Sequence, residues 1–160
     1  MSGSPMINRL RIETVFKDNR KVMALRGSID EDAQFDSLLG EKGTLYIDFE
    51  GVTSINSLGV RSWVNFLKAL GNRTIHYENC PPIVVRQLNR VPSFLGKAAV
   101  DSVYVPYICD SCEKEVLILI SKNALEKSPV NIPGTFSCEA CKNGEMEIDG
   151  RPEQYFAFKR

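Results

Sequence analysis

The sequence is poor in histidine, with His76 the only one among 160 residues. A Ser–His or Cys–His catalytic arrangement would have to use His76, which lies in a strand-like run with no nucleophile turn near it. The P-loop pattern and the GxGxxG pattern of nucleotide-binding loops are also absent. Neighbouring carboxylates such as Glu31 and Asp32 fall in a polar turn and are typical of a solvated surface. These absences predict a protein that is not an enzyme.

The chain also lacks an excess of charge and any long apolar run. Twenty Lys or Arg residues balance twenty Asp or Glu residues, so no net field draws the chain to nucleic acid or anionic lipid. No apolar run approaches the roughly 18–20 residues that span a bilayer. The first residues have neither a basic start nor an apolar core, unlike a secretory signal. We therefore expect a cytoplasmic protein with a flexible tail at residues 1–9, in which Met1 or Met6 is the true start.

Residues 10–106 are expected to form the first domain, in which strand-like and helix-like segments alternate. Apolar and polar residues alternate over Leu10–Phe16, Asp18–Asn19 is a turn signal, and Val22–Leu25 is a second strand, which together predict a hairpin. Thr44–Phe49 is nearly continuous apolar and aromatic sequence, as in a strand that is covered on both faces.

Two later segments show helical spacing. One runs from Val60 to Leu70 and is stopped by Gly71. The other opens at Pro81–Pro82 and ends or kinks at Pro92. Further strands are predicted at Thr74–Glu78 and Val103–Val105. The alternation predicts an α/β fold in which a mixed, partly parallel sheet carries packed helices.

Four of the five cysteines are grouped after residue 106. Cys109 and Cys112 form one CxxC pair, and Cys138 and Cys141 form another. Two such knuckles can place four thiolates at tetrahedral corners, which suits one structural zinc ion without an open position for substrate. Two disulfides, a redox-active CxxC and an iron–sulfur cluster are the alternatives, and the lack of a secretory signal favours reduced thiols. Cys80 stands apart and is predicted to be a small residue in a turn or at the edge of the core.

Residues 107–160 form the second expected domain and resemble the zinc-ribbon family, in which two knuckles on hairpins hold one zinc. Its strand candidates are Val116–Ile120, Met146–Ile148 and Tyr155–Phe158, with a turn at Asp149–Gly150. Zinc ribbons are common in nucleic-acid machinery. Here seven Lys or Arg residues face nine Asp or Glu residues, a net charge of −2 before any metal binds. Arg86 and Arg90 are the best candidate basic spot elsewhere, too small for a nucleic-acid footprint.

The first domain carries a second resemblance. Leu25–Asp30 and Leu45–Leu70 resemble the second strand and the centre of the STAS domain, a family that includes the bacterial anti-sigma factor antagonists. The resemblance implies a small regulator that binds a partner kinase or anti-sigma factor and is switched by phosphorylation of a serine or threonine. Ser57 occupies the acceptor position, two residues before Gly59. Asn56 stands where the antagonists usually carry Asp.

The expected function is therefore that of a non-enzymatic signalling regulator that works by protein–protein binding. The expected docking surface comprises Asn56, Ser57, Leu58, Gly59 and Arg61. Ser57 can alternatively serve only as the N-cap of the helix, and Leu58 is expected to tuck into the sheet. Two other functions stay open: an unphosphorylated adaptor that uses the zinc ribbon as its contact surface, and a nucleic-acid-binding accessory factor. The ribbon is expected to occupy the place where a STAS domain usually continues into a closing helix.

Overall fold

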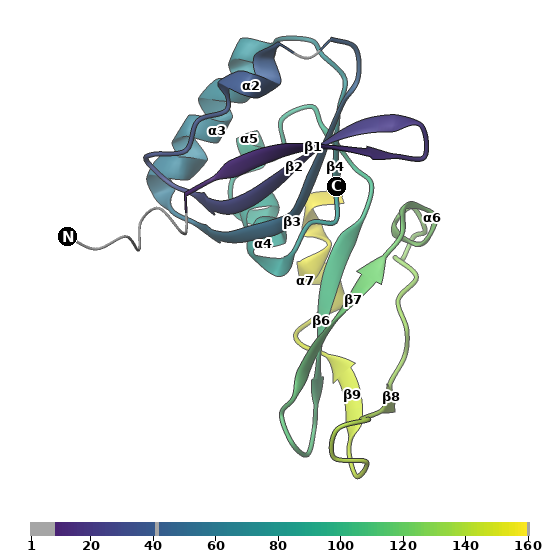
Figure 1. Ribbon diagram of the computed structural model, residues 1–160. Coiled ribbons are helices and arrows are strands. Elements are labelled where there is room, and N and C mark those ends of the chain that lie inside the picture. Colours follow the sequence, from purple (N-terminus) through teal and green to yellow (C-terminus); the bar gives the residue numbers. More distant parts are fainter. Residues whose placement is uncertain (1–8, 41, 160) are drawn as a thin grey trace, which may run out of the picture.

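The computed structural model describes residues 9–40 and 42–159, and these form two β-sheets with helices packed on the first (Figure 1). The predicted α/β class with a mixed sheet is confirmed. The expected tail at residues 1–9 lies outside the described part except for Arg9, which forms a bridge with Ser28. No helix in the described ranges is long and apolar enough to cross a membrane.

The first sheet has five strands in sequence order, and only its first pair is antiparallel. The predicted hairpin is confirmed, with a turn at Asp18 and Asn19, both at positive φ. Phe16, one of the alternating apolar residues of this strand, is 75% exposed, because the strand lies at the sheet edge. The five strands are β1 Arg11–Lys17, β2 Arg20–Ile29, β3 Leu45–Ile55, β4 Ile75–Glu78 and β5 Ala99–Val100.

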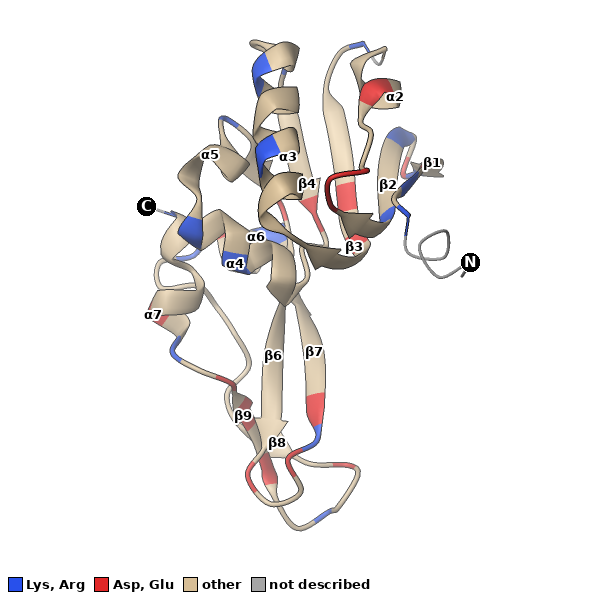
Figure 2. Ribbon diagram, turned by 90° about the vertical axis from the view of Figure 1, so that its left-hand side faces the viewer, with Lys and Arg blue, Asp and Glu red and all other residues tan. Residues whose placement is uncertain are grey.

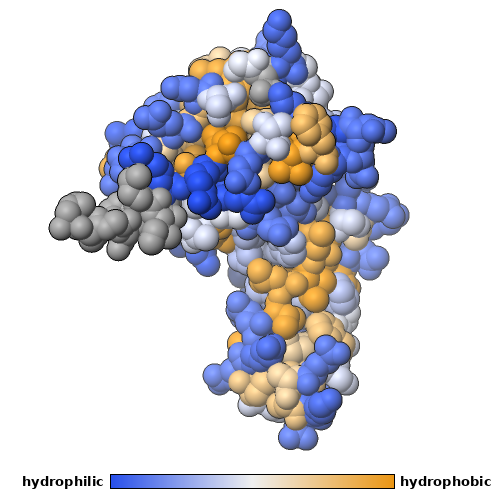
Figure 3. Space-filling view, in the orientation of Figure 1, coloured by the Kyte–Doolittle hydropathy of each residue, from blue (hydrophilic) through white to orange (hydrophobic). Residues whose placement is uncertain are grey.

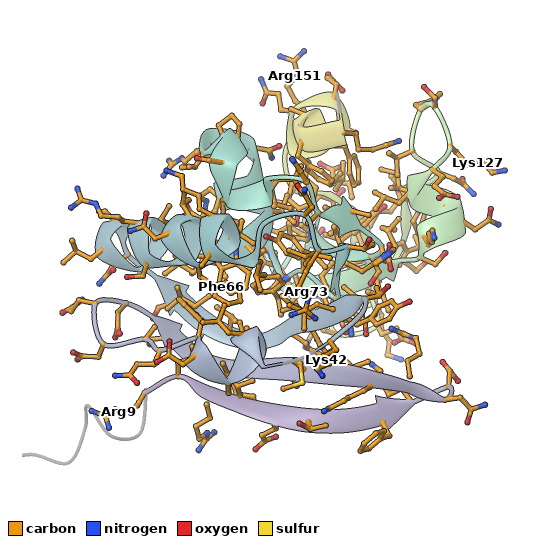
Figure 4. The ribbon with its side chains drawn as sticks, turned by 90° about the horizontal axis from the view of Figure 1, so that it is seen from above. Arg9, Lys42, Phe66, Arg73, Lys127 and Arg151 are labelled. Carbon is orange, nitrogen blue, oxygen red and sulfur yellow. The ribbon has the colours of Figure 1, made fainter. Side chains whose placement is uncertain are left out.

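Helices cover one face of this sheet (Figure 1). The two predicted long helices are present as α3 Ser57–Leu70 and α4 Pro82–Arg90, accompanied by the short α2 Asp36–Leu39 and α5 Pro92–Leu95. Gly71 ends α3, and Pro82 lies in the first turn of α4, as expected. Figure 4 shows Phe66 of α3 in the layer between the helix and the strands, where it is 7% exposed.

An aromatic cluster forms the centre of the core between α3 and the sheet. The Trp63 ring meets the edge of Phe35 at a centroid distance of 4.9 Å, and Phe49 meets Tyr77 at 4.9 Å. The Trp63 Nε1–H donates to the Tyr77 hydroxyl at 3.0 Å, which in turn donates to the carbonyl of Phe94 at 2.8 Å. The polar atoms of these buried rings are therefore satisfied while their apolar surface fills the core.

The second sheet projects away from the first and has the strand order β7-β6-β9-β8 (Figure 1). Its first strand, β6, was predicted at Val103–Val105 as the last strand of the first domain, but it runs on to Cys109 and belongs to the second sheet. Cys80 links the sheets: its N–H donates to the Ser102 carbonyl at 3.1 Å, and its carbonyl accepts from Tyr104 at 2.8 Å. The elements are β6 Val103–Cys109, β7 Glu115–Ile120, α6 Lys122–Leu125, β8 Phe136–Ser137 and β9 Glu145–Ile148.

The last residues are helical, so the strand expected at Tyr155–Phe158 is wrong. They form α7 Pro152–Tyr155 and a 3-10 turn at Ala157–Lys159. Pro152 opens the helix because its ring fixes φ and its missing N–H is not needed in the first turn. Phe156 and Phe158 are buried to 7% and 8% exposure, so their aromatic side chains meet the core without pairing as a strand.

Candidate functional site

Four cysteine side chains converge at the far end of the second sheet. The sulfur atoms of Cys109, Cys112, Cys138 and Cys141 all lie within 4.8 Å of one another. Across the two CxxC pairs, Cys109 Sγ lies 3.7 Å from Cys141 Sγ, and Cys112 Sγ lies 3.8 Å from Cys138 Sγ. The four predicted ligands are therefore brought together in a group that can hold a metal ion.

Local chain geometry builds each knuckle. Cys109 ends β6, and the N–H groups of Ser111 and Cys112 approach its sulfur at 3.3 and 3.4 Å. Glu113 and Lys142, each one residue past the second cysteine of its pair, both adopt φ +64 and turn the chain back. Each turn thus places its two sulfur atoms on the same side of the chain.

Gly144 is required where the second knuckle passes the first. A Cβ at Gly144 would lie 2.6 Å from both Cys109 Sγ and the Asp110 carboxylate. The Glu145 N–H donates to that carboxylate at 3.0 Å, which ties the two knuckles together. A side chain at position 144 would therefore push apart the groups that hold the cysteines in place.

The sulfur spacing fits a tetrahedral metal site and not a pair of disulfides. Zinc–sulfur bonds of about 2.3 Å in tetrahedral geometry set neighbouring sulfurs about 3.8 Å apart, close to the separations observed here. A disulfide requires about 2.05 Å, and all five cysteines are free. Because each sulfur is contributed by the protein, the group leaves no corner for a substrate.

The knuckle N–H groups prepare part of the cluster for metal binding. The N–H of Cys141 lowers the pKa of Cys138 to about 6, and the N–H of Asn143 lowers the pKa of Cys141. The pKa of Cys112 is raised to about 11, since burial and the neighbouring thiols outweigh the lowering by the Lys114 N–H. Four thiolates at this spacing repel one another, so the fully deprotonated set requires a cation at its centre.

A second candidate site lies at the start of α3. Asn56 is the N-cap: its side-chain oxygen accepts from the Gly59 N–H at 2.8 Å, so the alternative in which Ser57 serves only as the N-cap is wrong. The Asn56 Nδ2 donates to Glu31 at 2.8 Å, and this hydrogen bond lowers the pKa of the Glu31 carboxyl. The Ser57 side chain is exposed. Because Asn56 caps the helix, the Ser57 hydroxyl is not needed as the N-cap.

The predicted docking residues differ in exposure. Asn56, Ser57 and Arg61 are exposed, and Gly59 is buried against the end of β2. Leu58 was expected to tuck into the sheet, but it is 49% exposed, because it lies on the outer side of the first helical turn. The start of α3 therefore presents a hydroxyl, an apolar side chain and a cation to solvent.

Three further residues are placed by contacts with segments distant in the sequence. His76 Nδ1 lies 3.0 Å from the Asp101 carboxylate, and its ring stacks on Tyr46, so the lone histidine has a structural environment. Cys80 is fully buried, and burial raises the pKa of its thiol. Glu31, assigned from sequence only to a solvated turn, contacts the N-cap 25 residues further along the chain, which no local pattern indicates.

The cap itself gives a direct test. Asn56→Ala removes the side-chain acceptor for Gly59 and is expected to lower the free energy of unfolding by about 1 kcal/mol. Ser57→Ala at the next position is the control and should stay within about 0.5 kcal/mol of wild type. Urea unfolding followed by circular dichroism measures both. An effect of Ser57→Ala equal to that of Asn56→Ala would contradict the assignment of the cap.

No family model, no curated protein and no solved structure matches the chain. The fold and the two sites described above therefore supply the support for function.

Proposed function

We propose that the four cysteines hold one structural zinc ion and that the protein is a STAS-like regulator that acts by binding another protein. The donor set supports the metal, because four thiolates are the ligands of closed zinc sites. Zinc at this site would supply no catalysis. It would join the β6–β7 turn to the β8–β9 turn. The second of these turns is flanked by short strands, β8 with two residues and β9 with four.

The single observation that carries the regulatory proposal is the exposed start of α3. Leu58, 49% exposed, is a large apolar side chain next to a hydroxyl that has no capping role. Apolar anchors surrounded by polar groups are typical of protein-binding surfaces. A hairpin followed by parallel strands, with a helix that begins directly after β3, supports the STAS-like interpretation of the first sheet.

Phosphorylation of Ser57 is the proposed switch. A partner kinase would transfer the terminal phosphoryl group of a nucleoside triphosphate to the Ser57 oxygen, with loss of the hydroxyl proton. The phosphate adds a charge of about −1.5 to −2 at an exposed position of the first helical turn, where helix N–H groups tolerate an anion. Glu31 is already hydrogen-bonded to the neighbouring Asn56, so the modified surface would present two adjacent negative groups to a partner.

Affinity purification from the native cell tests this proposal. Wild-type bait should recover a protein partner, and Ser57→Asp should recover at least about tenfold less, equal to a loss of about 1.4 kcal/mol. Mass spectrometry should find phosphate on Ser57 in a fraction of the native protein. Equal recovery by both baits, with no phosphate on Ser57, would contradict the switch.

The anchor has a matched control. Leu58→Ala is expected to weaken partner binding by about tenfold or more, as for a buried interface anchor. Leu39→Ala removes a leucine of similar exposure, 45%, from α2 and should leave binding unchanged. Equal losses of partner binding for the two variants would show that binding depends on exposed leucines in general. That result would contradict a docking site at the start of α3.

A second candidate function is an adaptor in which the ribbon makes the contact. Figure 3 shows an apolar patch on the second sheet, and Leu117 and Leu119 of β7 are 46% and 47% exposed there. The two side chains share a face because they are two residues apart on a strand. If the adaptor interpretation holds, Leu117→Ser with Leu119→Ser abolishes partner recovery while Ser57→Asp and Leu58→Ala do not.

A further inference from the structure

A groove lies where α4, β6 and the C-terminal helix α7 meet. It has a volume of about 440 Å³, within the range of small-molecule sites. One wall of the groove is formed by Pro82 and Val85 of α4 and Pro106 of β6, and Tyr155 of α7 lines the other wall. The carbonyl of Tyr155 accepts from Asn89 Nδ2 at 3.0 Å. This hydrogen bond fixes α7 against α4 and so holds the two walls of the groove at a constant separation.

Three arginines surround this groove: Arg86, Arg90 and Arg151. Arg86 and Arg90 are exposed, lie one helical turn apart on α4, and form no salt bridge with any residue in the described ranges. Arg151 pairs only with the exposed Glu153 at 3.1 Å, and its side chain projects outward from the α7 end in Figure 4. One acid, Asp149, also lines the groove, so its charge is net positive.

The arrangement of the guanidinium groups selects the kind of anion. Side chains four residues apart on a helix are neighbours, so Arg86 and Arg90 can reach the same bound group. A carboxylate has two oxygens, which one arginine fork can satisfy. A phosphate has three terminal oxygens and carries more charge, and it can therefore accept from both forks at once.

The rest of the groove suits a compact ligand with an organic part. Val85 is fully buried and Pro106 is buried, so the inner wall is apolar. The side-chain oxygen of Asn89 is buried and accepts no hydrogen bond from the described residues, so a ligand hydroxyl or amino group near it would meet a free acceptor. A long polyanion is disfavoured, because β9, the strand that leads to Asp149, carries the acidic residues Glu145 and Glu147 (Figure 2).

We propose that this groove binds a small phosphate-bearing molecule of about the size of a nucleoside monophosphate. Arg86 and Arg90 hold the phosphate, Arg151 closes the outer side, and the apolar wall contacts the organic part. The proposal does not depend on the protein-binding role of α3, because the groove and the start of α3 share no residue.

Titration of the metal-loaded 160-residue chain tests the groove. Adenosine monophosphate and inorganic phosphate are the two phosphate probes, and adenosine is the probe without phosphate. Isothermal calorimetry should show saturable binding of the monophosphate, weaker binding of phosphate at the same site, and none of adenosine. A bound ligand should also raise the thermal midpoint, since it stabilises only the folded state.

Arg86→Gln with Arg90→Gln is expected to weaken monophosphate binding by at least about tenfold, with the urea midpoint unchanged. Lys68→Gln with Lys122→Gln removes the same charge elsewhere and should leave binding unchanged. If the double variant fails to fold, Arg90→Lys, which keeps the charge and loses the fork, should still weaken binding.

Three results would overturn the proposal: no saturable binding of either phosphate probe up to about 1 mM, binding that both double variants reduce equally, or binding of adenosine as tight as that of the monophosphate. Tighter binding of a duplex oligonucleotide than of the monophosphate, lost on Arg86→Gln with Arg90→Gln, would assign the groove to nucleic acid instead.

Discussion

The purified 160-residue chain is expected to contain one zinc ion, and Cys138→Ser is expected to lose it. Cys138 is 2% exposed and its sulfur lies 3.8 Å from that of Cys112, so a hydroxyl in its place leaves the metal site with three thiols. Structural zinc contributes about 10–16 kcal/mol to the folding of small zinc domains, so its loss should destabilise the second sheet by at least about 3 kcal/mol. The end of that sheet has little else to hold it, because β8 has only two residues.

Metal analysis of the purified protein measures the stoichiometry, and cobalt substitution reports the ligands through the absorption of a tetrahedral thiolate site. Hydrogen exchange should then show lost protection in β8 and β9 of Cys138→Ser while β2 and β3 stay protected. Cys80→Ala is the matched control, since it removes a buried cysteine that is not in the cluster and should keep one zinc per chain. A wild-type protein that folds without stoichiometric metal would contradict the site.

The cysteine cluster could be predicted from sequence because its geometry is local. Two residues between cysteines are enough to define a knuckle, and the turns at Glu113 and Lys142 lie within one residue of the motif. Only the contact between the two knuckles is long-range. It could be predicted because four cysteine thiolates are the ligand set of a single zinc ion. The hairpin and the two long helices could also be predicted from local sequence, because the spacing of apolar residues distinguishes a strand from a helix.

The features that were missed depend on contacts between distant segments. The Glu31–Asn56 hydrogen bond joins residues 25 positions apart. The aromatic sequence Tyr155–Phe158 predicts a strand, but strands and buried short helices share this composition, and here the segment is helical. The strand at Val103–Val105 was predicted correctly, but the sheet to which it belongs was not. The sequence of a strand does not specify which strand it pairs with.

Gly59→Ala is expected to be the most damaging single substitution among the residues that pack on the first sheet. A Cβ at this position would overlap the carbonyl group of Ile29 and would lie 2.8 Å from the Asp30 nitrogen. These are backbone atoms at the end of β2, which cannot rotate away as a side chain can. The same Ile29 carbonyl accepts from the Asn56 N–H at 3.1 Å, so moving it also disturbs the start of α3. We expect a loss of about 3 kcal/mol in the free energy of unfolding, the upper end for overpacking.

Gly40→Ala is the matched control for this prediction. Nothing lies within 4 Å of a Cβ at Gly40, and its φ of −76 is ordinary for alanine. It should change the free energy of unfolding by less than about 0.5 kcal/mol, or increase it slightly by restricting the unfolded chain. Urea unfolding of both variants measures the difference, and equal stabilities would contradict the close approach of α3 to β2. The contact explains why a glycine follows Ser57 by two residues: it lets the helix start against the strand end, and that position leaves Ser57 and Leu58 facing solvent.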